Sequence, residues 1–216
     1  MKQLRIAHKL WFSVLSVVLL LVLATGFAGY RTLTVEAQSD AASAALAMRV
    51  EAALRWTGLT ETNAARTHAV IVSSDPAVEQ VFKEPMAATT AGISKVQKSL
   101  ETMGLSEADR AQMAKIAAAR KAMAEARAKA RQLKADGQAE EAVAFINGSY
   151  TPASNAYLQT LHDFVQMQQQ AASQQAQITL ATRTTTLQIA AAIVGLVLLA
   201  LVLGAGWLIR SIQQPL

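Results

Sequence analysis

Two long uncharged apolar segments, one near each end of the chain, limit its possible folds more than any other feature. The first covers residues 10–30, and the second covers residues 189–209 and is followed by Arg210. Each has 21 residues, and at about 1.5 Å per helical residue this length is roughly 30 Å, the thickness of the hydrocarbon core of a bilayer. We therefore predict two transmembrane helices, over residues 10–30 and 187–209.

The charges around these segments predict their orientation. Three of the residues 1–9 are basic, and Arg210 follows the second segment. Because basic residues are enriched on the cytoplasmic side of membrane spans, residues 1–9 and 210–216 are predicted to be cytoplasmic and residues 31–183 to lie outside. A cleaved signal peptide is the alternative for the first segment, but its apolar part is longer than the about 7–15 residues typical of signal peptides.

The composition of the chain favours helices. Hydrophobic residues make up 52% of the chain but aromatic residues only 5%, and alanine supplies much of the difference. Alanine is the strongest helix former, whereas strands favour β-branched and aromatic residues. The chain has no cysteine, which excludes disulfides, thiolate metal sites and cysteine nucleophiles. An all-α domain held together by packing alone follows from these facts.

Proline and glycine mark the predicted ends of the first two helices of the middle region. Residues 31–73 read as one helix, and Ser74-Asp75-Pro76 after it is predicted to be a turn or a helix start. A second helical run covers residues 86–103, with Pro85 predicted at its first position and Gly104 as a candidate C-cap.

The third helix begins at a capping-box pattern. Ser106 and Asp109 have the spacing at which each side chain caps the backbone of the other. No glycine or proline follows until Asp136-Gly137, so the helix is predicted to run to Ala135 and to end at that turn.

The remaining residues return the chain to the second apolar segment. A short helix over residues 139–146 is predicted to end at Asn147-Gly148, and the fourth long helix, from Pro152, is predicted to continue into the second span. Four antiparallel helices bring the chain back to the bilayer. The predicted fold is an up-down-up-down antiparallel four-helix bundle over residues 31–183, flanked by two transmembrane helices.

Two arginines fall on a line of the third helix that is expected to face other helices. In a seven-residue repeat, one position is shared by Met113, Arg120, Arg127 and Lys134. The stretch 120–134 holds six basic residues and one acid, and an arginine buried without a partner is costly because it stays charged. The guanidinium groups are expected to reach the surface, pair with acids, face a dimer partner or bind an anionic ligand.

For the ligand alternative, residues on the other helices at similar heights complete a candidate site. The predicted ligand-binding residues are Arg66, Thr90, Arg120, Arg127 and Tyr157. Three cations and two hydroxyls suit a small acid with one to three carboxylates, because forked guanidinium donors match carboxylate oxygens. Thr90 and Tyr157 are equally compatible with ordinary packing in a bundle.

Other chemistries have no support in the sequence. The three histidines, His8, His68 and His162, form no pair at metal-ligand spacing, and there is no phosphate-binding loop or nucleophile elbow. We predict no enzymatic activity, no metal and no cofactor. All fifteen acidic residues lie between Glu36 and Asp163, so the net positive charge reflects the membrane flanks and no nucleic-acid surface is predicted.

Four short motifs occur in order along the chain. They are Ile6-Ala7-His8-Lys9-Leu10, Leu133–Gly137 followed by Glu141-Ala142, Pro152 with Tyr157 and Leu161, and Arg210–Leu216 after the second apolar segment. In this order they resemble the four-helix-bundle class of methyl-accepting chemotaxis proteins. The last motif is similar to the first residues of a HAMP signal-relay module.

This resemblance implies several properties. It implies a periplasmic bundle that is anchored in the bacterial inner membrane and forms a homodimer. It also implies that arginines bind organic acids. Here these arginines would be Arg66, Arg120 and Arg127, with Thr90 and Tyr157 beside them. The chain is expected to stop within HAMP, at residues 210–216. The methylation helix and the contacts with a cytoplasmic chemotaxis kinase and adaptor are then expected beyond it.

The predicted function is that of a chemoreceptor for small organic acids, either di- and tricarboxylates or aromatic carboxylates. The signal is expected to pass through the fourth helix and the second span to the cytoplasmic module. Two alternatives remain. One is the same sensor attached to a histidine kinase or cyclase, and the other is an adaptor that senses a protein or the envelope without a small ligand.

Overall fold

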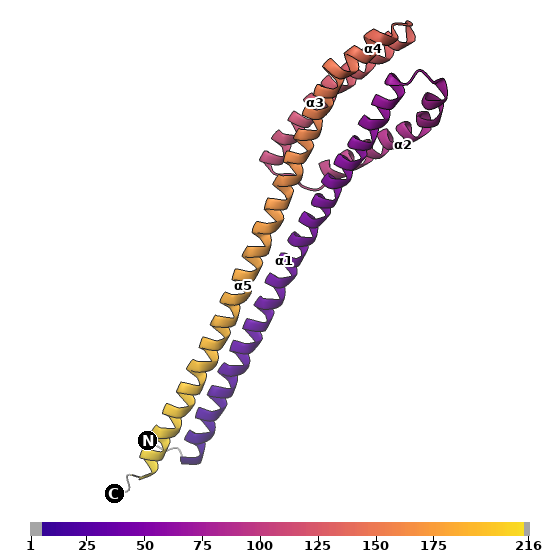
Figure 1. Cartoon of the computed structure of the whole chain (residues 1–216). Coiled ribbons are helices and arrows are strands. Elements are labelled where there is room, and N and C mark those ends of the chain that lie inside the picture. Colours follow the sequence, from indigo (N-terminus) through magenta and orange to yellow (C-terminus); the bar gives the residue numbers. More distant parts are fainter. Residues whose placement is uncertain (1–5, 214–216) are drawn as a thin grey trace. The chain divides into compact units, whose positions relative to one another are not determined.

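The computed structural model describes the backbone of residues 6–213 and side chains from residue 15 to 206, except those of residues 16–17, 20, 24, 28, 31 and 205. All elements in this part of the chain are helical (Figure 1). They are α1 (Ile6–Val72), α2 (Pro76–Glu101), α3 (Glu107–Ala135), α4 (Ala139–Phe145), the π-helical turn η1 (Ile146–Tyr150) and α5 (Thr151–Gln213).

Residues 1–5 and 214–216 lie outside the described residues. The predictions for the first residues of the cytoplasmic N-terminus and for the end of the HAMP motif fall there. The remaining residues form two compact units. The bundle unit is Ser43–Gln174, and the terminal unit comprises the described residues up to Ala42 and from Gln175 onward.

The bundle unit confirms the predicted all-α bundle. Its four arms are the end of α1, then α2, then α3, and finally the continuous helix formed by α4, η1 and the start of α5. At one end, Lys134 of α3 donates hydrogen bonds to the carbonyls of Val70 and Ser73, where α1 stops. At the other end, Arg49 of α1 donates to the carbonyl of Gly104, between α2 and α3. The arms therefore alternate in direction.

Helix α2 starts at Ser74-Asp75-Pro76, which was predicted as a turn or a helix start, and not at Pro85. The helix begins at Pro76, and the Asp75 side chain accepts a hydrogen bond from the Ala77 amide at 2.8 Å. Pro85, predicted at the first position, lies inside the helix instead. Asp75 and Pro76 together satisfy the N-terminal requirements of a helix nine residues earlier in the chain. The carbonyl that Pro85 leaves without an intrahelical donor belongs to the exposed Val81, where water can bind it.

The two turns that bound α3 confirm their predictions. Ser106 and Asp109 form the capping box, with Asp109 N donating to Ser106 Oγ at 3.1 Å and Ser106 N donating to Asp109 Oδ2 at 2.9 Å. Gly104 and Gly137 adopt positive φ angles of 65° and 79°, a conformation that glycine adopts without strain. Helix α3 ends at Ala135 as predicted.

The break predicted at Asn147-Gly148 is absent. The chain passes from α4 through the π-helical turn η1 into α5 without leaving helical geometry. Ile146 and Tyr150, at the two ends of this turn, are fully buried. Their burial outweighs the weak helix propensity of Asn147-Gly148, because tertiary packing overrides local propensity.

Two apolar clusters form the core of the bundle unit. The first includes Trp56, Leu100, Ile116, Leu161 and Phe164. The second contains Ile71, Ala130, Leu133, Ala142, Ile146 and Tyr150. Residues at heptad or neighbouring helical spacing line this core: Met86, Ile93 and Leu100 on α2, and Tyr157, Leu161, Phe164 and Gln168 on α5, are all buried.

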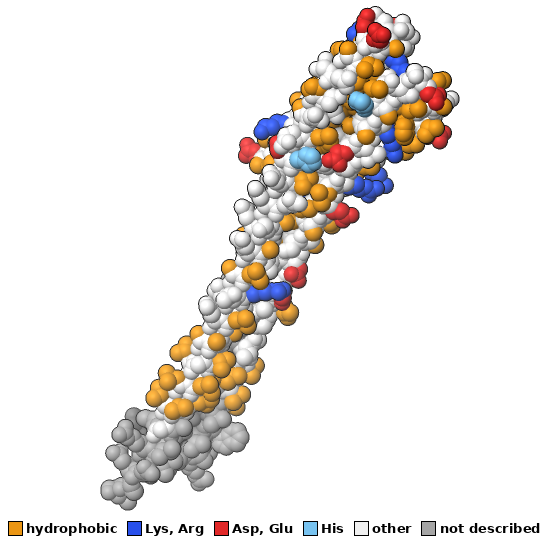
Figure 2. All heavy atoms as spheres, viewed as in Figure 1, with side chains coloured by type: hydrophobic (Ala, Val, Ile, Leu, Met, Phe, Trp, Pro, Cys, Tyr) orange, Lys and Arg blue, Asp and Glu red, His pale blue; other side chains and the backbone are white. Residues whose placement is uncertain are grey.

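The terminal unit has a different surface. Its apolar side chains are mostly exposed, including Leu198 and Val202, and Figure 2 shows hydrophobic groups gathered beside the grey atoms. Polar contacts between its helices include Ser39 Oγ to Thr179 Oγ1 at 2.6 Å and an Arg183–Glu36 ion pair at 2.8 Å.

One helical segment in the described part of the chain, Ala139–Gly204, is long and apolar enough to cross a membrane. As predicted, α5 continues without interruption through this region. The first predicted span, residues 10–30, is helical within α1, but many of its side chains lie outside the description. The presence of two spans therefore stays a prediction.

Candidate ligand-binding site

A layer of buried polar residues lies between residues of the two apolar clusters. On α1, this layer consists of Thr60, Asn63 and Thr67, all buried. Burial of polar groups is costly unless they are hydrogen-bonded, so a polar layer inside a bundle calls for an explanation. The layer surrounds a cavity of about 50 Å³. The polar residues that line it come from all four arms: Thr60, Asn63, Thr67, Thr90, Arg120, Arg127, Tyr150 and Tyr157.

The structure brings four of the five predicted ligand-binding residues to this cavity. Thr90, Arg120, Arg127 and Tyr157 all line it. Arg66 is placed beside it, where its guanidinium donates to Thr89 Oγ1 at 2.8 Å and to the Pro85 carbonyl at 3.2 Å. Arg66 thus ties α1 to α2.

Asn63 holds the wall of the cavity between α1 and α2. Its Nδ2 donates to Thr90 Oγ1 at 3.0 Å, and Thr90 Oγ1 donates in turn to the Met86 carbonyl at 2.8 Å. Within the described residues, the buried Asn63 Oδ1 has no hydrogen-bond partner. The amide of Asn63 is therefore hydrogen-bonded on its nitrogen side only.

The two arginines of the cavity carry charge without a matching acid. Arg120 donates to Gln97 Oε1 at 2.7 Å. No described carboxylate lies within ion-pair distance of Arg120 or Arg127. Burial lowers the pKa of Arg127 and the charge of Arg131 lowers it further, while Tyr150 opposes this effect. Because guanidinium stays protonated at ordinary pH, the cavity has a positive potential.

Two tyrosines supply neutral hydroxyls to the same cavity. Burial raises the pKa of Tyr150, against a hydrogen bond with Thr67 and the charge of Arg127. Burial also raises the pKa of Tyr157, whose hydroxyl accepts a hydrogen bond from Trp56 Nε1 at 2.9 Å. Both phenols therefore remain protonated at neutral pH and act as hydrogen-bond donors.

An outer groove of about 840 Å³ adjoins this cavity between α2 and α3. Thr90 and Arg127 line both spaces, so these two residues form the boundary between them. Farther out, the groove is lined by Lys83 and Arg131, with Glu79 as its one acidic residue. Excess positive charge in a concave site attracts anions and strengthens their binding.

The sequence-based site omitted several of these residues. Tyr150 lies seven residues before Tyr157 and shares its face of the helix. Because a break was predicted at Asn147-Gly148, Tyr150 was not assigned to the same helix as Tyr157. Asn63 belongs to the α1 stripe that Trp56 begins and Thr67 continues at alternating spacings of four and three. This heptad spacing is the signal that marks Asn63 as an inward residue.

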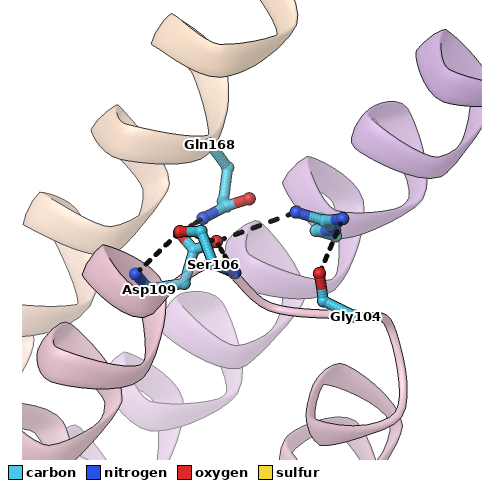
Figure 3. Close-up of polar contacts among 5 residues, drawn as sticks. Gly104, Ser106, Asp109 and Gln168 are labelled. Carbon is cyan, nitrogen blue, oxygen red and sulfur yellow. Dashed lines mark hydrogen bonds and ion pairs between the residues drawn. The ribbon is translucent and has the colours of Figure 1, made fainter.

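A second polar cluster lies near the α2–α3 loop and has balanced charge. Asp109, on α3, accepts hydrogen bonds from Ser106 and, at 2.6 Å, from Gln168 Nε2 on α5. Arg49 on α1 lies 3.7 Å from Asp109 and also donates to the Gly104 carbonyl. Figure 3 shows Gln168 and Ser106 directed at Asp109. This cluster joins three helices and a loop. The negative charge of Asp109 is already balanced by Arg49.

The model of a family described as a four helix bundle sensory module for signal transduction matches residues 3–182. The chain belongs to this family, the four-helix-bundle sensory modules of methyl-accepting chemotaxis proteins, as the sequence resemblance predicted. No curated protein matches the chain.

Proposed function

We propose that this chain is the input region of a transmembrane chemoreceptor that binds a small carboxylate in the bundle. One observation carries the proposal. Arg127 is half-buried, lines both the cavity and the groove, and has no carboxylate partner among the described residues. A partly desolvated guanidinium with a path to solvent is a site where an anion gains a charge-assisted hydrogen bond.

The membrane arrangement supports a receptor of this kind. Apolar side chains of the terminal unit are exposed along α1 and α5, as lipid contact requires and water does not favour. With basic residues at both flanks, the proposed receptor crosses the inner membrane twice and holds residues 31–183 in the periplasm. It forms a homodimer, and a HAMP module begins at residues 210–216.

The proposed signal passes along α5. The cavity is lined by Tyr150 at the end of η1 and Tyr157 on α5, and by Asn63 on α1. A ligand held between these residues shifts the receptor only if it binds one arrangement of the two helices more tightly than another. Both helices continue toward the predicted spans. A small displacement of α5 would then reach the cytoplasmic module, where the chemotaxis kinase and adaptor act.

The output beyond the chain separates this proposal from its nearest alternative. A histidine kinase or a cyclase can carry the same input bundle. The output domain to which the bundle is joined would decide between these receptors directly. An adaptor that senses a protein or the envelope is the other alternative, and it requires no small ligand.

The ligand proposal is tested by calorimetry on the full chain in lipid nanodiscs, with succinate, malate, citrate and benzoate as probes. We expect at least one acid to bind, and Arg127→Ala to weaken it by about tenfold or more, because hydrogen bonds to charged groups contribute about 1.5–3 kcal/mol. Lys121→Ala is the matched control, since it removes an exposed cation from the same helix. An absence of binding by every acid, or equal affinity in the two variants, would contradict the proposal.

A further inference from the structure

Helices α1 and α5 lie side by side in the terminal unit (Figure 1) and enclose a groove. The groove consists of two adjoining spaces of about 280 and 450 Å³. Thr32, Val35, Thr182 and Thr186 line both spaces and form the boundary between them. All described residues that line the groove belong to the terminal unit. The groove is therefore a separate site from the cavity in the bundle.

This groove is polar at one end and apolar at the other. At the polar end, Arg183 on α5 donates to Glu36 Oε1 on α1 at 2.8 Å. At the other end, the described lining residues carry no charge and include Phe27, Ile189 and Ile193. Phe27 and Ile189 are exposed, so this end favours an apolar occupant.

The predicted span boundaries fall within the groove. Spans over residues 10–30 and 187–209 place Ile193 among the hydrocarbon chains, with Glu36 and Arg183 on the extracytoplasmic side. At about 1.5 Å per helical residue, the charged pair lies within about 10 Å of the hydrocarbon boundary, near the lipid headgroups. The groove thus has the polarity profile of a phospholipid, charged at the membrane surface and apolar toward the bilayer centre.

The charged pair has capacity left for a zwitterionic headgroup. Its contact joins Nη2 of Arg183 to Oε1 of Glu36, and the two side chains are 56% and 45% exposed. A guanidinium has five N–H donors and a carboxylate accepts at both oxygens, so the pair can still donate to a phosphate and accept from an ammonium group. An anionic headgroup brings no cation for Glu36, and a choline headgroup has no N–H to donate.

We propose that the groove binds one phospholipid with a primary ammonium headgroup, phosphatidylethanolamine, from the outer leaflet. Its phosphate lies at Arg183, its ammonium group at Glu36, and one acyl chain along Phe27 and Ile189. The inference rests on the membrane arrangement of the proposed function and is independent of the carboxylate ligand. A lipid in this place bridges α1 and α5, beside the path of the proposed signal.

Native mass spectrometry of the full chain in lipid nanodiscs tests the headgroup. The nanodiscs contain phosphatidylcholine, phosphatidylethanolamine and phosphatidylglycerol in equal fractions. We expect phosphatidylethanolamine to be retained about tenfold or more over either other lipid, because charge-assisted hydrogen bonds distinguish the three headgroups. Glu36→Gln should lower the preference over phosphatidylcholine severalfold. Asp40→Asn is the matched control, since it neutralises an exposed acid of α1 outside the groove.

A second variant tests the apolar end without altering the charged pair. Ala190 lines that end, and Ala190→Phe should fill it and abolish lipid retention. Ala191→Phe places the same ring at an exposed position that does not line the groove, and it should retain the lipid. If Glu36→Gln fails to fold, this pair of variants still decides.

Each remaining outcome contradicts the inference. Equal retention of the three lipids, or an unchanged preference in Glu36→Gln, overturns the choice of headgroup. Unchanged retention in Ala190→Phe overturns the placement of the acyl chain. Retention of no lipid overturns the whole inference, and a disulfide between two copies of Ala190→Cys would then assign the groove to a second copy. These results leave the carboxylate site standing, whereas a chain that does not insert into nanodiscs overturns the membrane arrangement and the lipid inference together.

Discussion

Single residues in this bundle divide into those whose charge is balanced and those whose charge is not. Asp109 is buried but is surrounded by donors from Ser106 and Gln168 and by the guanidinium of Arg49. Arg127 is half-buried and has no comparable partner. This contrast supports a structural role for the first residue and the proposed binding role for the second, although both are charges inside the bundle.

The pKa of Asp109 predicts a pH dependence of stability. Burial raises this pKa, but hydrogen bonds from Ser106 and Gln168 and the charge of Arg49 outweigh burial and leave it lowered. A carboxyl whose pKa is lower in the folded state contributes stability above its unfolded pKa and loses it as the pH falls through the folded value. We expect the free energy of unfolding to fall below about pH 4.

Asp109→Asn removes the charge and should lower the free energy of unfolding at pH 7 by about 1–3 kcal/mol. It should also flatten the acid dependence below about pH 4. Denaturant unfolding of the full chain at several pH values measures both effects. The control is Glu107→Gln, at an exposed position in the same first turn of α3. An unchanged acid dependence in Asp109→Asn would show that other carboxyl groups are responsible.

At the scale of the element, local chemistry predicted helix ends well and helix interiors less well. The capping box at Ser106 and the left-handed glycine at Gly137 depend on a few neighbouring residues, so the sequence is sufficient to locate them. Pro85 and the turn at Asn147-Gly148 looked like breaks, yet both lie inside helices. Pro85 lies inside a helix because Asp75 and Pro76 provide a better helix start nearby. Asn147-Gly148 stays helical because of core packing against residues distant in sequence, and a local pattern does not contain that information.

The continuity of α5 makes it the proposed signalling element, and this predicts the effect of a kink. Helix α5 runs from Thr151 to Gln213, and Ala181 is an exposed position within it. Proline there removes a backbone hydrogen bond and bends the helix, at a cost of about 3 kcal/mol. In a chimera that joins this chain to a HAMP-linked kinase, we expect Ala181→Pro to bind ligand within about twofold of the parent, because the cavity is distant in sequence.

The same chimera should lose the ligand response of its kinase. Autophosphorylation with and without ligand measures this response. Ala181→Ser, which keeps the helix, provides the comparison. A ligand response that survives in Ala181→Pro would argue against transmission through a rigid α5.

For the whole molecule, the pattern of apolar residues predicted the bundle, and the heptad register predicted part of the site. Arg120 and Arg127 came from that register and Thr90 and Tyr157 from their heights along the bundle, and the structure places all four around one cavity. Arg66 was also chosen by its height, but its guanidinium donates hydrogen bonds to Thr89 and to the Pro85 carbonyl. That difference depends on side-chain direction, which spacing alone does not give. Asn63 and Tyr150 also lie at inward heptad positions that the sequence contains, but the sequence-based site omitted them.

A labelling measurement tests the central claim, an anion site in a bundle held outside the cell membrane. The chain has no cysteine, so Ser94→Cys, in the outer groove, provides a single thiol. We expect a membrane-impermeant maleimide to label it in intact cells and saturating malate to slow that labelling. Ser99→Cys, an exposed position outside this groove, should label without protection. Labelling of Ser94→Cys only after the cells are opened, or at a rate that no carboxylate changes, would contradict the account.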